Sequence, residues 1–341
     1  MKKILLTVFS LGIFATATAQ QLNPAPVVAG VESEINYLSS GFLSLLGDAI
    51  GAGLSNGWYH TAETHKVGRF GISLAPMIVR VPDNRTTFTI EQSKLQELEL
   101  VDPNDNVTPT AFGEDEPGVR LEYKANFGPV SQSEEFNMPS GYGFQYLPLF
   151  TFGASVGLPF NTDLSVRYLP QLNIPGLEDT RINLYGAGLT HDILQFIPVA
   201  KKLPFDASLF VGFTNLEFEQ DIDDSGADDQ ATLAITTRSY TTRLLVSKEI
   251  LFLTLYGGVG YNGGDSRIQL LGTYTYMNPL DLQSPEEQVK DPVDFTTSDF
   301  NGMVGNAGFR LKFLWVAYFA ADYTFGAYDA LTTNLGVSID F

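Results

Sequence analysis

The chain has 341 residues, with 39 acidic and 20 basic side chains, no cysteine and a formal net charge of −19. Four stretches, 82–143, 171–179, 221–230 and 278–298, hold 24 of the acidic residues and five of the basic ones. These stretches are typical of solvated loops. Nucleic-acid binding is excluded as a function class because it requires a basic patch, and the lack of cysteine excludes a disulfide framework.

The first twenty residues have the pattern of a secretory signal peptide. Lys2 and Lys3 form a positive start, residues 4–14 are apolar, and Ala17-Thr18-Ala19 is a small-residue cleavage motif. The apolar run is shorter than the ~20 residues that a membrane-spanning helix requires. We therefore expect residues 1–20 to be a cleaved signal peptide; an uncleaved anchor is the alternative.

Residues 21–65 precede the first strand signal and are predicted to form an N-terminal plug segment. The stretch 41–58 is apolar and rich in glycine, which suits packing inside a barrel mouth better than a free tail. We expect part of this segment to line a route for an apolar ligand, although a static cork would use the same residues. The candidate ligand-binding residues are Phe42, Leu46, Leu54, Asn56, Trp58 and Tyr59.

Period-two alternation begins near Val67 and continues to the chain end. In the last strand Leu335, Val337, Ile339 and Phe341 share one face and polar or small residues share the other. No run of 18 apolar residues follows residue 20, yet the chain has 25 Phe, 15 Tyr and 32 Gly. This composition favours an all-β fold, a transmembrane antiparallel β-barrel of about 10–12 strands over residues 66–341; a soluble β-sandwich or solenoid is the alternative.

Turn signals divide this region into ten strands. The predicted strands are 66–80, 144–158, 162–170, 180–190, 204–220, 231–248, 251–277, 299–313, 315–327 and 332–341. Short links should be periplasmic and long links extracellular, which requires 251–277 to be one strand with a kink or bulge at Gly263-Gly264. The barrel is then expected to close by pairing the first strand with the last.

Two further segments carry weaker signals. Residues 86–101 and 118–127 would form either an additional membrane pair, which gives twelve strands, or an extracellular hairpin. Residues 192–202 combine four apolar side chains with two lysines, which predicts a short periplasmic helix at the membrane edge.

No catalytic motif is recognised, so no enzyme activity and no cofactor are expected. The three histidines, His60, His65 and His191, lack metal-ligand spacing, and no Ser–His–acid set is apparent. Asp221, Asp223 and Ser225 match the opening of a calcium loop, but Thr232 stands where that loop needs a glutamate.

Charged residues also occur on the face that should turn toward the lumen. They would either pair with one another or form a selectivity ring. The predicted lumen charges are Arg69, Arg167, Arg310, Lys312, Asp322 and Asp340.

The sequence resembles a known but uncharacterised family. Residues 54–66 (LSNGWYHTAETHK), followed by Gly68-Arg69-Phe70, resemble the opening of domain of unknown function 6588, a family found in Bacteroidetes. Residues 108–113 and 188–205 resemble it too, so the similarity covers nearly all of the exported chain. The family carries no established activity.

The layout is more distantly similar to the FadL-type transporters of hydrophobic compounds, which have an apolar plug and long outer loops. Their Asn-Pro-Ala motif near the end of the plug is absent here, because Asn56 is followed by Gly57 and Trp58.

These patterns predict a protein of the bacterial outer membrane. We expect it to contact outer-membrane lipid, to meet the barrel-assembly machinery through its C-terminal Phe341, and to bind no nucleic acid. The first functional hypothesis is passive transport of small hydrophobic molecules. The second is a structural or adhesive barrel with acidic extracellular loops and no transport role, and a barrel hydrolase is the third.

Overall fold

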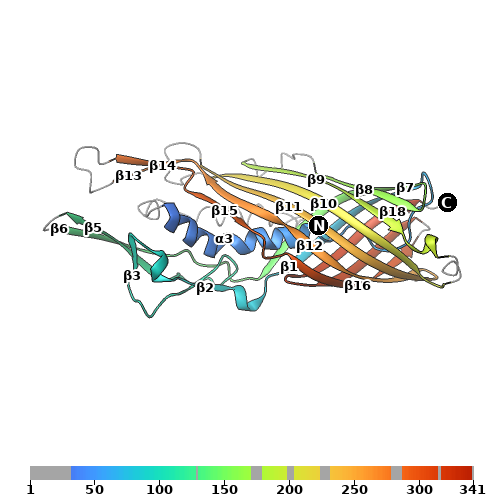
Figure 1. The fold of residues 1–341 in the computed structure, drawn as a ribbon, viewed down its shortest axis with the longest axis horizontal. Coiled ribbons are helices and arrows are strands. Elements are labelled where there is room, and N and C mark those ends of the chain that lie inside the picture. The colour runs from blue at the N-terminus through green and yellow to red at the C-terminus, as the bar shows by residue number, and fades with distance from the viewer. Residues whose placement is uncertain are drawn as a thin grey trace.

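Ten antiparallel strands form a closed ring in the computed structural model of the protein. Figure 1 shows this ring from the side. The structure describes residues 32–127, 130–169, 179–197, 203–222, 231–277, 286–313 and 316–339. The ring closes because β11 pairs with β12 from Thr232↔Leu271 to Ile250↔Leu253. The ring strands are β1 (Phe70–Arg80), β7 (Tyr146–Leu158), β8 (Thr162–Leu169), β9 (Thr180–Asp192), β10 (Asp206–Ile222), β11 (Ala231–Ile250), β12 (Leu253–Leu271), β16 (Gly302–Phe313), β17 (Ala317–Phe325) and β18 (Asp329–Ile339). The predicted all-β barrel is confirmed, with ten strands.

The first and last strands pair as predicted. Phe70 lies opposite Ile339 and Ile72 opposite Val337, and these side chains point outward. The predicted signal peptide, residues 1–20, lies outside the described residues, as do Asp340 and Phe341.

Strand β12 continues through Asn262, Gly263 and Gly264, which confirms that this sequence is not a hairpin turn. Its register with β11 is unbroken. On its other side, however, the three residues 263–265 lie opposite the four residues 298–301. The one additional residue of this irregularity therefore belongs to the segment between β15 and β16 and not to β12. The predicted strand ends earlier than expected, at Leu271, and Thr273–Met277 forms a separate strand, β13.

Gly264 is predicted to be irreplaceable in this strand. Its φ is +141°, and an added Cβ would lie 1.9 Å from the carbonyl oxygen of Arg238. We expect Gly264→Ala to lower the free energy of unfolding by at least about 2 kcal/mol, because that backbone region is nearly restricted to glycine. Urea unfolding in detergent would measure it, with Gly302→Ala as the control, since a Cβ there meets no atom within 4 Å. An equal effect of the two substitutions would contradict the prediction.

The other strands lie outside the ring. Residues 86–101 and 118–127 contribute to small sheets beyond one end of the barrel, so the twelve-strand alternative is wrong (Figure 1). The strands outside the ring are β2 (Thr87–Thr89), β3 (Leu98–Leu100), β4 (Val107–Pro109), β5 (Arg120–Phe127), β6 (Val130–Asn137), β13 and β14 (Glu286–Lys290). A further strand, β15 (Val293–Thr297), pairs with the part of β12 that continues beyond β16. The described part of the chain also contains the 3-10 turns η2 (Asp83–Arg85), η3 (Gln92–Lys94) and η4 (Leu194–Phe196).

The two ends of the barrel differ in their links. Tight turns join β7 to β8 and β11 to β12 at one end, and the long links between β1 and β7 and between β12 and β16 lie at the other. Short turns mark the periplasmic side of this barrel class. A helix over residues 192–202 was predicted on that side. In the described part of this segment, β9 extends to Asp192, and the only helical structure that follows is the single turn η4.

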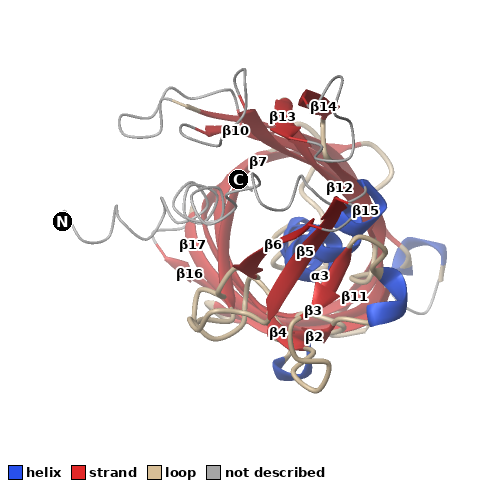
Figure 2. Ribbon diagram, turned by 90° about the vertical axis from the view of Figure 1, so that its left-hand side faces the viewer, coloured by secondary structure: helices blue, strands red, loops and turns tan. Residues whose placement is uncertain are grey.

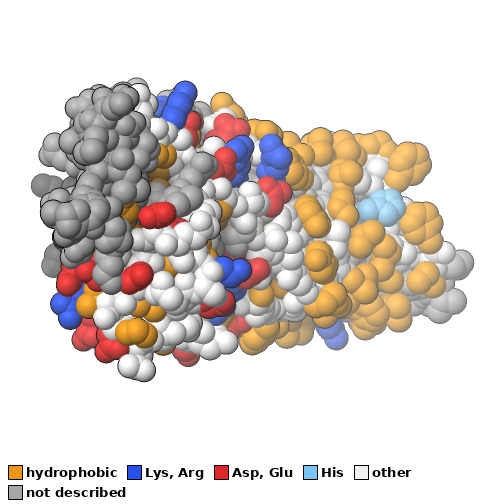
Figure 3. All heavy atoms as spheres, turned by 60° about the vertical axis from the view of Figure 1, so that its left-hand side comes forward, with side chains coloured by type: hydrophobic (Ala, Val, Ile, Leu, Met, Phe, Trp, Pro, Cys, Tyr) orange, Lys and Arg blue, Asp and Glu red, His pale blue; other side chains and the backbone are white. Residues whose placement is uncertain are grey.

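On the face that Figure 3 shows, hydrophobic side chains form an apolar band over the periplasmic half of the barrel, and the charged side chains lie mainly on the other half. On β11 the outward residues Tyr240, Leu244, Val246 and Ile250 are exposed. About ten residues at ~3.4 Å each, tilted by ~40°, span ~25 Å, which is the height of a lipid-facing band. Tyrosines are also exposed on the outer surface, at Tyr146, Tyr168, Tyr185, Tyr240 and Tyr261. We conclude that this band meets the membrane.

Inside the ring lies one long helix, α3 (Glu32–Leu54) (Figure 2). Its apolar side chains are buried on all sides, which a helix enclosed by a barrel wall requires. It packs against β1, β7, β11, β12 and β15. No helix in the described part of the chain is both long and apolar enough to cross a membrane.

Candidate functional site

Helix α3 is joined to the wall through buried Asp48. One carboxylate oxygen accepts hydrogen bonds from the Thr297 hydroxyl at 2.8 Å and from the Asp299 backbone N–H at 2.9 Å. The other accepts from the Tyr328 hydroxyl at 3.2 Å and lies 3.8 Å from the Arg85 guanidinium. Burial raises the pKa of Asp48 to about 6. These four groups fix the middle of the helix at the extracellular mouth.

The C-terminal end of α3 rests on Arg167 of β8, whose side chain is 2% exposed. The guanidinium donates to the Leu54 carbonyl at 2.9 Å and to the Asn56 carbonyl, and it lies 3.7 Å above the Trp58 ring. Among the described residues no carboxylate pairs with it. The partial negative charge of the helix end therefore provides its electrostatic partner.

Below the helix the chain continues as the plug tail, residues 55–65, through the lumen at membrane depth. The Tyr59 hydroxyl donates to the Asn306 side chain at 3.0 Å. Its ring makes edge contacts with Phe210 and Tyr256 at centroid distances of 5.5 and 6.5 Å. Aromatic side chains of the tail and the wall thus fill this level of the lumen.

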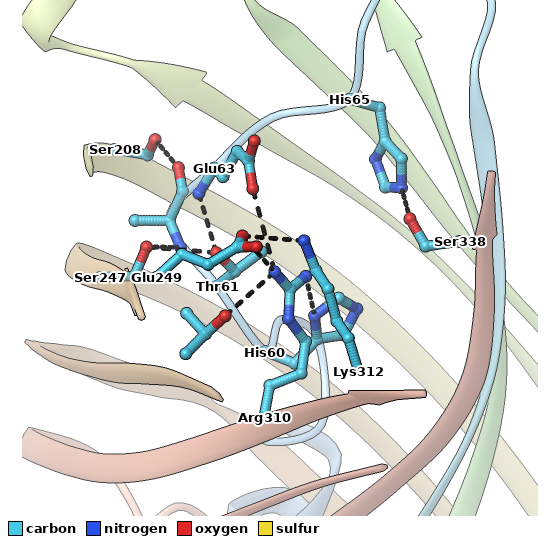
Figure 4. Close-up of polar contacts among 12 residues, drawn as sticks. His60, Thr61, Glu63, His65, Ser208, Ser247, Glu249, Arg310, Lys312 and Ser338 are labelled. Carbon is cyan, nitrogen blue, oxygen red and sulfur yellow. Dashed lines mark hydrogen bonds and ion pairs between the residues drawn. The ribbon is translucent and has the colours of Figure 1, made fainter. Parts of the chain in front are cut away.

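A charged cluster holds the tail near the periplasmic end (Figure 4). Buried Arg310 lies 3.8 Å from Glu63 and 3.6 Å from Glu249, and it donates to His60 Nδ1 at 3.3 Å. Lys312 pairs with Glu249 at 2.8 Å. Because a guanidinium can only donate, His60 Nδ1 is the acceptor in its contact with Arg310.

The end of the tail carries a second polar contact set. His65 Nδ1 lies 2.6 Å from an Asp163 oxygen, and the other Asp163 oxygen accepts the His65 backbone N–H at 2.9 Å. His65 Nε2 lies 3.1 Å from the Ser338 hydroxyl (Figure 4). No Ser–His–acid set was apparent in the sequence. The structure brings the side chains of Ser338, His65 and Asp163 together and so corrects this expectation.

A cavity of about 50 Å³ opens beside the tail. Among its lining residues are Trp58, His65, Ser155 and Asp163, and hydroxyl groups are frequent around it. Of the six predicted ligand residues, Trp58 and Tyr59 border this cavity. Phe42, Leu46 and Leu54 lie in the core around α3, and Asn56 bonds to the Ala52 carbonyl and the Thr324 hydroxyl.

The predicted lumen charges have different surroundings. Arg310 and Lys312 belong to the charged cluster, whereas Asp322 accepts a hydrogen bond from the Tyr256 hydroxyl at 2.9 Å. Arg69 lies just before β1, and its backbone N–H donates to the backbone carbonyl of Lys66. Asp340 lies outside the described residues.

The calcium candidate is occupied by protein contacts where the structure describes it. Asp221 pairs with Arg181 at 2.8 Å and accepts from the Thr232 hydroxyl. Asp223 and Ser225 lie outside the described residues, and no cluster of three metal-ligating side chains occurs in the described part.

A second cavity, of about 370 Å³, is a groove in the wall and is almost wholly apolar. Its centre is Pro76 of β1, where pairing with β18 stops after Leu74↔Leu335 and resumes at Met77↔Thr332. Proline has no N–H for the ladder, and the Thr333 hydroxyl donates to the Pro76 carbonyl instead. The groove residues are Leu74, Pro76, Met77, Ile78, Pro148, Leu149, Phe150, Phe152, Leu331 and Thr333.

A model of a family of unknown function, DUF6588, matches residues 1–341. The chain belongs to this family. The resemblance of the 54–70 and 188–205 segments is thereby confirmed, and Trp58, His60 and His65 lie in one of these segments. No protein of curated function matches the sequence.

Solved outer-membrane barrels are similar at low identity. Ail of Yersinia pestis is 9% identical, with 80% of this chain and 98% of that one covered and a TM-score of 0.28. The NalP translocator domain of Neisseria meningitidis is 12% identical, with 91% and 99% covered and a TM-score of 0.29. Omp33 of Acinetobacter baumannii is 11% identical, with 80% and 98% covered and a TM-score of 0.26. The closed ring of this chain and its apolar band place it in the bacterial outer membrane.

Proposed function

We propose that the protein is a passive transporter that lets small hydrophobic molecules pass between the lumen and the membrane through the wall groove at Pro76. The observation that carries this proposal is the interrupted β1–β18 ladder with an apolar cavity around it. Lining residues come from both faces of the sheet, because Ile78 is exposed outward whereas Met77 and Leu149 are buried toward the lumen.

The plug tail lies directly behind this part of the wall. A Cβ on Gly57 would lie 2.9 Å from the Ala75 Cβ and 3.3 Å from the Met77 side chain. A small shift of the tail would therefore connect the groove with the lumen. Apolar lining with few polar groups is the usual property of a site for hydrophobic ligands.

Filling the groove is the direct test. We expect Leu331→Trp to reduce uptake of a fluorescent fatty acid to the level of cells that lack the protein. Leu244→Trp is the matched control, since Leu244 and Leu331 are both lipid-facing and both 45% exposed. Equal uptake by cells with and without the protein, across fatty acids, aromatics and terpenoids, would refute transport.

The second candidate is a structural or adhesive barrel without a transport role. The filled lumen favours it, because Tyr59, Phe210 and Tyr256 occupy the membrane level and α3 occupies the mouth. Side chains commonly fill small barrels in this way. The same uptake experiment separates the two candidates.

A further inference from the structure

The contact set of Ser338, His65 and Asp163 has the connectivity of a nucleophile, its base and an orienting carboxylate. Asp163 contacts both the ring Nδ1 and the backbone N–H of His65, so it fixes the ring and retains the proton on Nδ1. His65 Nε2 is then the acceptor for the Ser338 hydroxyl at 3.1 Å. A serine is activated as a nucleophile by such an adjacent base.

Space for a reacting group exists beside these atoms. Gly71 stands opposite both Ser338 and Ser155 in the sheet register. A Cβ on Gly71 would lie 3.2 Å from His65 Nε2 and 3.1 Å from the Ser155 hydroxyl. The absence of a side chain at Gly71 therefore leaves room between the base and a second hydroxyl.

The cavity of about 50 Å³ continues from this point and is lined by Ser73, Ser155 and Ser165. The cavity is small and only partly enclosed, so it accommodates a short acyl group beside the base. The hydroxyls on its wall can donate to a carbonyl oxygen. The His65 and Asp163 side chains are about one-tenth exposed, at 10% and 8%.

We propose that Ser338 is a nucleophilic serine at the periplasmic end of the lumen, and that it reacts with esters of short carboxylic acids. His65 is the general base, and Asp163 is a positioning residue that acts through His65. This activity is independent of transport through the wall groove, and it does not require the plug tail to move.

The reaction balances with water as the second reactant. The Ser338 oxygen bonds to the ester carbonyl carbon while its proton passes to His65 Nε2. The carbon–alkoxide bond then breaks, and the leaving alcohol takes the proton from His65. A water molecule, deprotonated by His65, next attacks the acyl-serine, which releases the carboxylic acid and restores Ser338.

The folded full-length protein in detergent can be treated with a fluorophosphonate probe, which forms a stable adduct on activated serines with loss of fluoride. Mass spectrometry should place the adduct on Ser338. Replacement of the base by His65→Gln should slow labelling by about 10²–10⁴-fold, the usual contribution of general base catalysis. Ser140→Ala, at the opposite end of the molecule, should label as the parent does.

Two further variants distinguish catalysis from a structural role. Gly71→Ala keeps all three polar groups but places a methyl beside His65 Nε2, and it should abolish labelling. Asp163→Asn should lower the rate and change its pH profile, because the ring loses its fixed tautomer. Heat-modifiability verifies that each variant is folded. The proposal is overturned if the folded parent gives no adduct on Ser338, or if His65→Gln labels at the parent rate.

Discussion

Replacement of Arg167 by methionine is expected to release the plug while the barrel remains closed. The substitution leaves the buried Leu54 and Asn56 carbonyls without their donor and removes the cation from above Trp58. An orphaned buried polar group costs about 1–3 kcal/mol and a desolvated cation–π contact about 2 kcal/mol. Because the variant no longer buries a charge, we expect a net loss of about 2–4 kcal/mol.

Planar-bilayer conductance and chymotrypsin cleavage after Trp58 or Tyr59 of the plug tail measure this release, and both should increase in Arg167→Met. Arg238→Met is the matched control, because Arg238 is an exposed arginine that points outward from β11. Parental conductance and cleavage in Arg167→Met would show that Arg167 does not hold the plug.

Most strands were predictable because the alternation of apolar and polar residues within a strand is local information. Alternation shows which residues face lipid, and the requirement for long extracellular links identified residues 251–277 as one strand despite their Asn262-Gly263 turn signal. The same rule failed at Gly272, where φ is +140° and the chain leaves the ring. Nothing in the alternation distinguishes a wall strand from its extension above the membrane.

Helix α3 was not predicted as a helix, since Gly41, Gly47, Gly51 and Gly53 each cost about 1 kcal/mol of helix propensity. In the structure these glycines face side chains of the wall and loops, so tertiary packing compensates for the lost propensity. The sequence indicated burial of this segment, but not the conformation that burial stabilises.

The Ser338, His65 and Asp163 set could not be found from sequence, because its spacing is decided by barrel closure. Ser338 and His65 are 273 positions apart, and His65 and Asp163 are 98 apart. β18 pairs with β1, β1 with β7 and β7 with β8, and this order of strands brings Ser338 and Asp163 to either side of His65. Arg167 was predicted to face the lumen, but its role at the end of α3 was not, since its partners are backbone carbonyls that have no sequence signature.

The stability of the protein is expected to fall as pH rises through about 6, and Asp48 is expected to be the cause. Its pKa is raised from 3.8 to about 6 by burial. The folded protein therefore binds this proton more tightly than the unfolded chain does. The stabilisation is fully present below about pH 4 and is lost as the pH passes 6.

A shift of about two pKa units corresponds to about 3 kcal/mol at 1.36 kcal/mol per unit. We expect urea unfolding in detergent to show a loss of about 2–3 kcal/mol between about pH 4 and pH 7 in the parent. Asp48→Asn should remove this part of the pH dependence. The asparagine oxygen can still accept from Thr297 and Asp299, so the variant retains the contacts that place α3.

The comparison of the two proteins isolates Asp48 from other groups, since burial also raises the pKa of Glu63 and that contribution is common to both. Identical pH profiles for the parent and Asp48→Asn would show that Asp48 stays ionised throughout. In that case the nearby Arg85 guanidinium at 3.8 Å and the three hydrogen-bond donors outweigh burial. The extracellular mouth would then be held by an ion pair, and both Arg85→Met and Asp48→Asn would loosen the helix.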